Sequence, residues 1–210
     1  MDTKTRLLNA AETLIVKQGA THVSMRKITE KAGANVASIN YHFGSKENLI
    51  SAVLVRFLTP LHDEQKRNLA AVMDEAGEAP PCLEEIIRSQ LEPLYRFTKN
   101  HPDWINDFHL ITAACDNNEL IRVSLKRLVK ENLHYLVACL AKALPAIPPM
   151  SLLRRVAFFQ VSKLGIIQGD IMMEDAIELL NIDRSGDAML EELTRFIASG
   201  LRAQPLQASA

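Results

Sequence analysis

Ser24–Lys46 reads SMRKITEKAGANVASINYHFGSK, and this stretch predicts the fold more specifically than any other part of the chain. Ser24 can cap a helix over 25–32, because its hydroxyl accepts a hydrogen bond from a free amide at the helix start. Gly33 closes that helix, since glycine adopts the left-handed conformation without steric cost. A second short helix, capped by Asn35, reaches about His42. Two short helices joined by so tight a turn indicate a helix-turn-helix.

The sequence on either side extends this motif into a compact head of three helices. Thr3 can cap a preceding helix that ends at Gly19, with an apolar stripe at helical spacing. Ser45 can cap a fourth, longer helix whose first turn carries Glu47, where the helix dipole favours a carboxylate. Thr59-Pro60 falls inside this fourth helix, and the proline should kink or break it because it removes one backbone hydrogen bond.

The rest of the chain shows helical periodicity and no sustained alternation typical of strands. We therefore predict an all-α protein of about nine helices, with a loop at Glu75–Pro81 and another connection at Pro145–Pro149. The five helices expected beyond the fourth cover, approximately, 82–100, 103–115, 119–144, 151–168 and 187–201.

The helix expected over 151–168 is apolar on two sides. Leu152, Val156 and Phe159 lie on one face, and Leu153, Ala157, Val161 and Leu164 lie on the next. Both faces of such a helix must pack against other helices, and a partner subunit is the simplest way to bury the second face. Burial of both faces within its own domain is the alternative.

Charge is unevenly distributed along the 210 residues, whose net charge is -1. Through Leu58 there are eight basic and four acidic residues, a balance of +4, which leaves -5 for the remainder. A basic head on an acidic body favours a polyanion as the partner of the head, since Lys and Arg neutralise phosphates in any DNA sequence.

Composition excludes several other classes. The amphipathic N-terminus lacks the uninterrupted apolar core of a signal peptide or a spanning helix, so we expect a cytoplasmic protein with no membrane partner. Cys82, Cys115 and Cys139 are widely spaced without a CxxC, which argues against disulfides or structural zinc. Glu131-x-x-His134 occurs once, whereas a di-iron bundle needs two such motifs. We expect no metal site and no cofactor.

The helix-turn-helix offers two kinds of DNA contact. Small or apolar Val36 and Ala37 can meet base edges and thymine methyl groups, and Asn40 can read an adenine edge. Tyr41, His42 and Lys46 can contact phosphate oxygens. The full set of candidate DNA-binding residues is Ser24, Arg26, Asn35, Val36, Ala37, Ser38, Asn40, Tyr41, His42 and Lys46.

At these residues the chain resembles the TetR family of transcriptional regulators. The order Gly33, a small polar segment, Ile39-Asn40-Tyr41-His42-Phe43, Ser45-Lys46-Glu47 and an apolar run matches the DNA-binding signature of that family over roughly the first quarter of the chain. Many relatives carry Tyr where this chain has Asn40. With this resemblance we divide the chain into a DNA-binding domain (1–46), a helical ligand-binding and dimerisation domain (47–204) and a tail (205–210).

The resemblance implies a homodimer whose interface is formed by the last two helices of each subunit. It also implies that this dimer binds a double-stranded DNA operator with two-fold symmetry. Candidate interface residues are Leu152, Val156, Phe159, Leu193, Phe196 and Ile197. It also implies a pocket for a small-molecule effector among the fourth to seventh helices, and its best candidates are Phe57, Leu91, Tyr95, Trp104, Phe108 and Ile111. Weaker resemblance of the body to the branch that responds to long-chain fatty acids suggests an apolar or amphipathic effector, a fatty acid or an acyl-CoA.

Two alternatives are open at this point. An enzyme of another class would use the apolar cavity with His109 and Asp107 as acid and base, but a helix-turn-helix head serves no purpose in such an enzyme. A regulator of the same fold would activate transcription instead of repressing it. We predict a repressor that is not an enzyme and that its effector releases from DNA.

Overall fold

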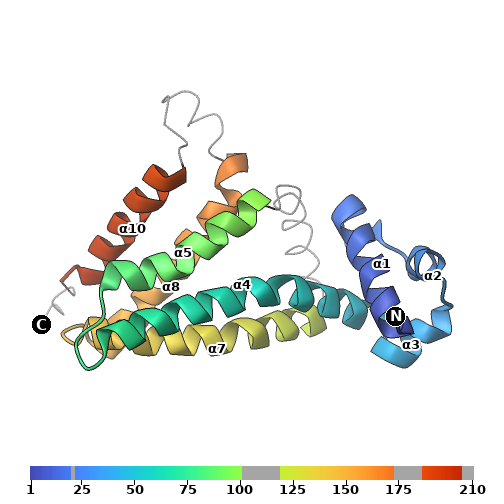
Figure 1. Cartoon of the computed structure of the whole chain (residues 1–210), viewed down its shortest axis with the longest axis horizontal. Helices are drawn as coiled ribbons and strands as arrows, with labels where there is room; N and C mark the ends of the chain where they lie inside the picture. Colours follow the sequence, from blue (N-terminus) through green and yellow to red (C-terminus); the bar gives the residue numbers. More distant parts are fainter. Residues whose placement is uncertain (20–21, 101–118, 173–185, 205–210) are drawn as a thin grey trace, which may run out of the picture. The chain divides into compact units, whose positions relative to one another are not determined.

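A computed structural model describes residues 1–19, 22–100, 119–172 and 186–204. Within these ranges the chain forms eight α-helices and no strand, which confirms the all-α class (Figure 1). The helix expected over 103–115 lies outside the described residues. No helix of the described part is long and apolar enough to cross a membrane.

The described residues divide into two compact units. The first contains Met1–His62 and the part of α7 (Glu119–Ala143) up to Lys130; the second contains Asp63–Asn100 and the chain from Glu131 onward. The boundary after His62 falls inside α4 (Lys46–Ala76), so one continuous helix contributes to both units.

In the first unit, α1 (Thr3–Gln18) packs against both α2 (Met25–Ala32) and α3 (Val36–Phe43). The shared core is apolar and fully buried, with Leu7, Ile28 and Ile39 each 0% exposed. The prediction that Thr3 caps α1 is wrong. Asp2 is the cap, and its side chain accepts a hydrogen bond from the Thr5 amide at 2.7 Å, because its carboxylate lies one residue before the first helical turn.

The turn between α2 and α3 follows the sequence prediction. The Ser24 hydroxyl accepts from the Lys27 amide at 3.2 Å and begins α2. Gly33 ends it in the left-handed region, with φ +58°, and a side chain added there would also approach Arg6 Nη1 at 3.7 Å. Asn35 Oδ1 then accepts from both the amide and the hydroxyl of Ser38, at 2.9 Å each, and starts α3.

Helix α4 does not break at Pro60 and continues to Ala76. Ser45 caps it as expected, accepting from the Asn48 amide at 3.1 Å. Beside the proline, the Thr59 hydroxyl donates to the Val55 carbonyl at 2.6 Å, which adds a local bond in the turn that lacks one backbone donor.

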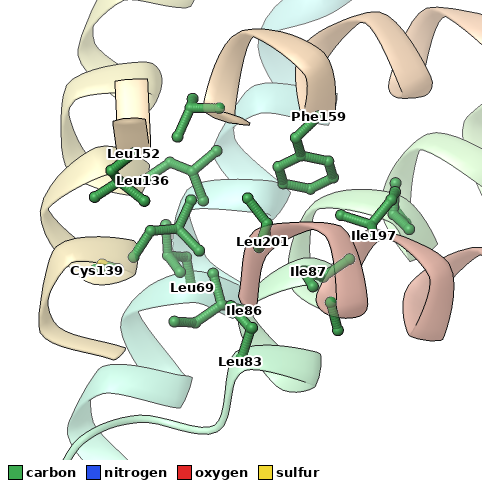
Figure 2. Close-up of a cluster of buried hydrophobic side chains, with 14 of the residues drawn as sticks. Leu69, Leu83, Ile86, Ile87, Leu136, Cys139, Leu152, Phe159, Ile197 and Leu201 are labelled. Atoms are coloured by element: carbon green, nitrogen blue, oxygen red, sulfur yellow. The ribbon is translucent and has the colours of Figure 1, made fainter. Parts of the chain in front are cut away.

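The second unit is built around α5 (Leu83–Asn100), which contacts both α8 (Pro149–Met172) and α10 (Gly186–Arg202). Its core gathers side chains from α4, α5, α7, α8 and α10 (Figure 2). Helix α8 begins at Pro149, two residues before the expected Ser151, since a proline is well suited to the first helical position, where no amide donor is needed. Cys139 is buried in this core, whereas Cys82 is exposed.

Candidate DNA-binding site

Helix α3 has one buried face and one open face. Ile39 is buried and anchors the helix on α1 and α2. Val36, Ala37, Asn40 and Tyr41 are all exposed, and their spacing of one, four and five residues places them on the same side of a helix. Tyr41 is 85% exposed, which is unusual for a large ring and leaves it available to a partner.

The remaining candidates on α3 have additional roles. His42 is half-buried, and its ring meets that of Tyr41 edge to face at a centroid distance of 4.9 Å. Asn35 and Ser38 are engaged with each other in the cap, so their oxygens hold the start of α3. Contacts from these two residues to DNA are therefore left to the Asn35 amide nitrogen and the Ser38 hydroxyl lone pairs.

Basic and hydroxyl groups frame this face. Arg26 and Ser24 are exposed at the start of α2, and Lys46 is half-buried as the first residue of α4. Lys4 lies 6.0 Å from the centre of the Phe43 ring, and Lys27 donates to Gln18 at 3.0 Å. Both lysines add positive charge near the candidate site, although the sequence motif did not single them out.

Two residues of α4 that the sequence analysis missed, Asn48 and Arg56, hold this helix against the three-helix head. Asn48 Nδ2 donates to the Phe43 carbonyl at 2.8 Å, which ties the start of α4 to the end of α3. Arg56 donates to Asn9 Oδ1 at 2.9 Å and forms an ion pair with Glu12, both on α1. No local pattern identifies the ion pair, because Arg56 and Glu12 are 44 residues apart.

The residues expected to form a dimer interface are for the most part buried within the chain. Phe159 is 2% exposed, and Leu152, Val156 and Ile197 are also in the core, with Leu193 packed against it. Of the six, Phe196 is exposed, at 74%. The reason is that α5 and α10 cover the Leu152, Val156 and Phe159 face of α8, so a partner can meet only the other face.

That other face of α8 is open and apolar. Phe158 is 71% exposed and Val161 65%, and Met150 and Leu153 are exposed on the same helix. An apolar groove of about 240 Å³ runs between α8 and α10, with Phe158 and Phe196 in its lining. Exposed apolar surface of this extent on neighbouring helices is typical of a protein interface.

The residues expected to bind a ligand are only partly within the described structure. Leu91 is 0% exposed in the core of the second unit, and Tyr95 is half-buried with Lys99 Nζ 4.7 Å from its ring centre. Phe57 is half-buried in the first unit. Trp104, Phe108 and Ile111, like Asp107, His109 and Cys115, lie outside the described residues.

Within the described ranges, no three or more His, Cys, Asp or Glu side chains are grouped so that they could hold a metal ion. Glu131 and His134, the pair considered from the sequence, are both exposed on α7.

The short α2, the tight turn and the open face of α3 define the first unit as a helix-turn-helix protein of the DNA-binding class. A family model described as "Bacterial regulatory proteins, tetR family" matches residues 7–53. This match covers the helix-turn-helix, and it agrees with the resemblance to the TetR family found at the same residues of the sequence.

One curated relative is the HTH-type transcriptional repressor KstR2 of Rhodococcus jostii (strain RHA1), 29% identical over 91 residues. The match spans 43% of each chain, less than half of the relative's length. The proteins matched are transcriptional regulators rather than enzymes, which argues against the catalytic alternative built on His109 and Asp107.

Two solved structures share the fold along nearly the whole chain. A putative transcriptional regulator from Pseudomonas aeruginosa PAO1 superposes with a TM-score of 0.64 at 17% identity, covering 95% of this chain and 91% of its own. The fatty acid degradation regulator FadR from Bacillus halodurans superposes with a TM-score of 0.60 at 14% identity, and the match covers 97% of this chain and 98% of the FadR chain.

Proposed function

We propose that this protein is a ligand-responsive repressor that binds a palindromic operator as a homodimer. The observation that carries the proposal is the open face of α3, where Val36, Ala37, Asn40 and Tyr41 project from a helix anchored by Ile39. A recognition helix needs this arrangement, because its exposed side chains must reach base edges while its buried face keeps it in register.

Each exposed residue has a chemical role on DNA. Val36 and Ala37, at the N-terminal end of α3, suit close approach to bases and apolar contact with thymine methyl groups. The Asn40 amide can donate and accept at once, which matches an adenine edge. Tyr41, His42 and Lys46 supply phosphate contacts that fix the register of the protein on the duplex.

The dimer is proposed on the open face of α8 and α10. Phe158, Val161 and Phe196 present apolar area to solvent, and a second copy offers the same surface with matching chemistry. A two-fold interface of this kind is self-complementary, so one patch suffices for both subunits. Two heads then read half-sites about 34 to 36 Å apart, or a multiple of that distance.

We propose an apolar or amphipathic effector, in keeping with a helical body whose core is largely aliphatic. A long-chain fatty acid or acyl-CoA is one such class, and one protein of similar fold is described as a fatty acid degradation regulator. An effector that binds one conformation of the body better than another would change the separation of the heads and thereby release DNA. Such a regulator acts in the cytoplasm, where its operator is.

The experiment is selection of bound fragments from sheared host DNA by the full-length protein, followed by footprinting of the recovered sequence. We expect an inverted repeat whose half-sites are separated by about one helical turn or a multiple of it. Retention of unrelated fragments with equal affinity, abolished by moderate salt, would refute a sequence-specific regulator. Transcription from a promoter that carries the recovered operator then distinguishes a repressor from an activator.

A further inference from the structure

Three buried amide side chains meet inside the second unit, each from a different helix. Gln65 on α4, Gln90 on α5 and Asn132 on α7 are 1%, 0% and 8% exposed. Buried side chains that bear polar groups are uncommon unless those groups are hydrogen-bonded.

The amide cluster, Gln65, Gln90 and Asn132, forms a polar layer in an otherwise apolar bundle. One helical turn along each helix, the corresponding residues are Leu69, Ile86 and Leu136, all part of the core and drawn together in Figure 2. A leucine or isoleucine at each amide position would therefore continue the core. Burying the amides raises the free energy of the folded state, unless every polar atom has a hydrogen-bond partner.

Hydrogen bonds fix which end of each amide is the nitrogen and which is the oxygen. Gln65 Nε2 donates to the Gln90 carbonyl at 2.8 Å, and Gln90 Nε2 donates to the Gln65 carbonyl at 3.4 Å. Only the amide nitrogen can donate, so the oxygen of Gln65 must face the other way, where it accepts from Asn132 Nδ2 at 3.3 Å. Flipping any one amide would break this chain of bonds.

Two carbonyl oxygens are left over by this arrangement. Gln90 Oε1 and Asn132 Oδ1 are buried without a hydrogen-bond donor in the structure that is described. Each such acceptor destabilises the fold, because it has left water without gaining a donor. The groups bonded within the cluster are amides, the Ser89 hydroxyl and main-chain carbonyls, none of them ionisable.

We propose that Gln90 Oε1 and Asn132 Oδ1 form a polar subsite that accepts hydrogen bonds from a hydroxyl or an N–H group of an uncharged, otherwise apolar effector. Acceptors require a donor, which an alcohol or an amide provides. A carboxylate provides only further acceptors and would place its charge against carbonyl oxygens. The subsite rests on the proposed function as a ligand-responsive regulator, and it favours a neutral alcohol or amide over a fatty acid anion.

Calorimetric titration of the full-length protein without DNA tests the subsite. The probes are 1-decanol, its methyl ether and decanoate at pH 8. We expect 1-decanol to bind about tenfold more tightly than the ether, which lacks the donor, because about 1.4 kcal/mol corresponds to a tenfold change in affinity. Decanoate should bind more weakly than the alcohol. Equal affinity for alcohol and ether, or no binding of any probe, overturns the proposal.

Two variants assign the preference to the two acceptors. Gln90→Met and Asn132→Leu should each reduce the preference for alcohol over ether to within about threefold, since the acceptor is gone. Asn68→Leu, the same change at a half-buried amide of α4 outside the cluster, should keep it. A preference that survives Gln90→Met and Asn132→Leu contradicts the assignment.

Probe affinity, rather than stability alone, separates a ligand subsite from a purely structural layer. Each replacement also removes a donor, Gln90 Nε2 to the Gln65 carbonyl or Asn132 Nδ2 to Gln65 Oε1, so a lower melting temperature is expected in either case. A lower melting temperature together with unaltered probe affinities would show a structural layer or a bound water, and would overturn the subsite. Failure of the regulator itself is read independently, as absence of a selected DNA sequence, and does not alter the probe measurement.

Discussion

We expect sequence reading by α3 to depend most on Asn40. It lies on the exposed face between Val36 and Tyr41, and its amide donates from one atom and accepts at another, as a two-bond contact with an adenine edge requires. Because many proteins of the TetR family carry Tyr at this position, we expect Asn40 to give this chain a base preference that differs from theirs.

Asn40→Ala should relax the base preference at one operator position by about 1 to 3 kcal/mol while leaving the other positions unchanged. The check is binding to a set of operators, each with one base pair replaced. An equal loss of affinity on operator and random DNA would show that Asn40 contacts the backbone instead.

Lys46→Ala provides the contrast. A phosphate contact carries no sequence information, so affinity should fall nearly uniformly across DNA sequences, and the slope of log affinity against log salt should decrease by about one. Anisotropy titrations at several salt concentrations measure both. An altered base preference with an unchanged slope would exclude the phosphate role.

At the scale of elements, α3 depends on its cap. Asn35 Oδ1 accepts from the Ser38 amide and hydroxyl. Because α3 has only eight residues, it has few further backbone hydrogen bonds to offset the loss of this cap. Asn35→Ala should lower the free energy of unfolding by about 1 kcal/mol. Thermal unfolding measures this, with Asn35→Asp as the matched control that keeps the acceptor. Equal stability of wild type and Asn35→Ala would mean that the cap does not hold α3.

Ion pairs join α5 and α10. Arg202 Nη2 donates to Glu84 Oε2 at 2.7 Å, and this hydrogen bond lowers the pKa of Glu84 from its usual 4.5 to about 2. A carboxyl group whose pKa is lower in the folded state stabilises the fold above pH 4.5. That contribution disappears as the pH falls toward 2.

Glu84→Gln should therefore reduce stability at pH 7 by less than about 1 kcal/mol, since both partners are partly solvated. The difference from wild type should shrink between pH 4.5 and 2. Urea unfolding at several pH values tests this, with Glu85→Gln, at the adjacent exposed carboxylate, as the control. A difference that persists at pH 2 would rule out the ion pair as its source.

At the scale of the whole molecule, adjacent phenylalanines on α8 have opposite environments. Phe159 is 2% exposed in the core, and Phe158 is 71% exposed beside the groove with α10. The sequence pattern identified two apolar faces correctly but could not tell which one faces inward. The proposed dimer therefore depends on Phe158 rather than on Phe159.

Phe158→Glu should give a folded monomer with weak operator affinity, because dimerisation would bury the new carboxylate of each subunit in the interface with the partner subunit. Sedimentation equilibrium measures the mass, and circular dichroism confirms the helices. Val123→Glu, at an exposed apolar residue of α7, is the control and should behave as wild type. An unchanged dimer mass for Phe158→Glu would contradict the proposed interface.

Local sequence determined the parts of this protein whose physics is local. Ser24, Gly33, Asn35 and Ser45 set helix boundaries through bonds within three or four residues, so their roles could be predicted from the chain alone. The cap of α1 was misassigned by one residue, from Asp2 to Thr3, because both side chains can accept the same bond. The exposed face of α3 followed from helical periodicity.

Only the tertiary structure decided which surfaces meet. It placed Leu152, Val156 and Phe159 inside, left Phe158 and Phe196 outside, and joined three amides separated by 25 and 67 residues into one layer. Periodicity reports that a helix has an apolar side, but it does not report what covers that side. Long-range packing chooses the cover, because it depends on the summed burial of helices far apart in sequence.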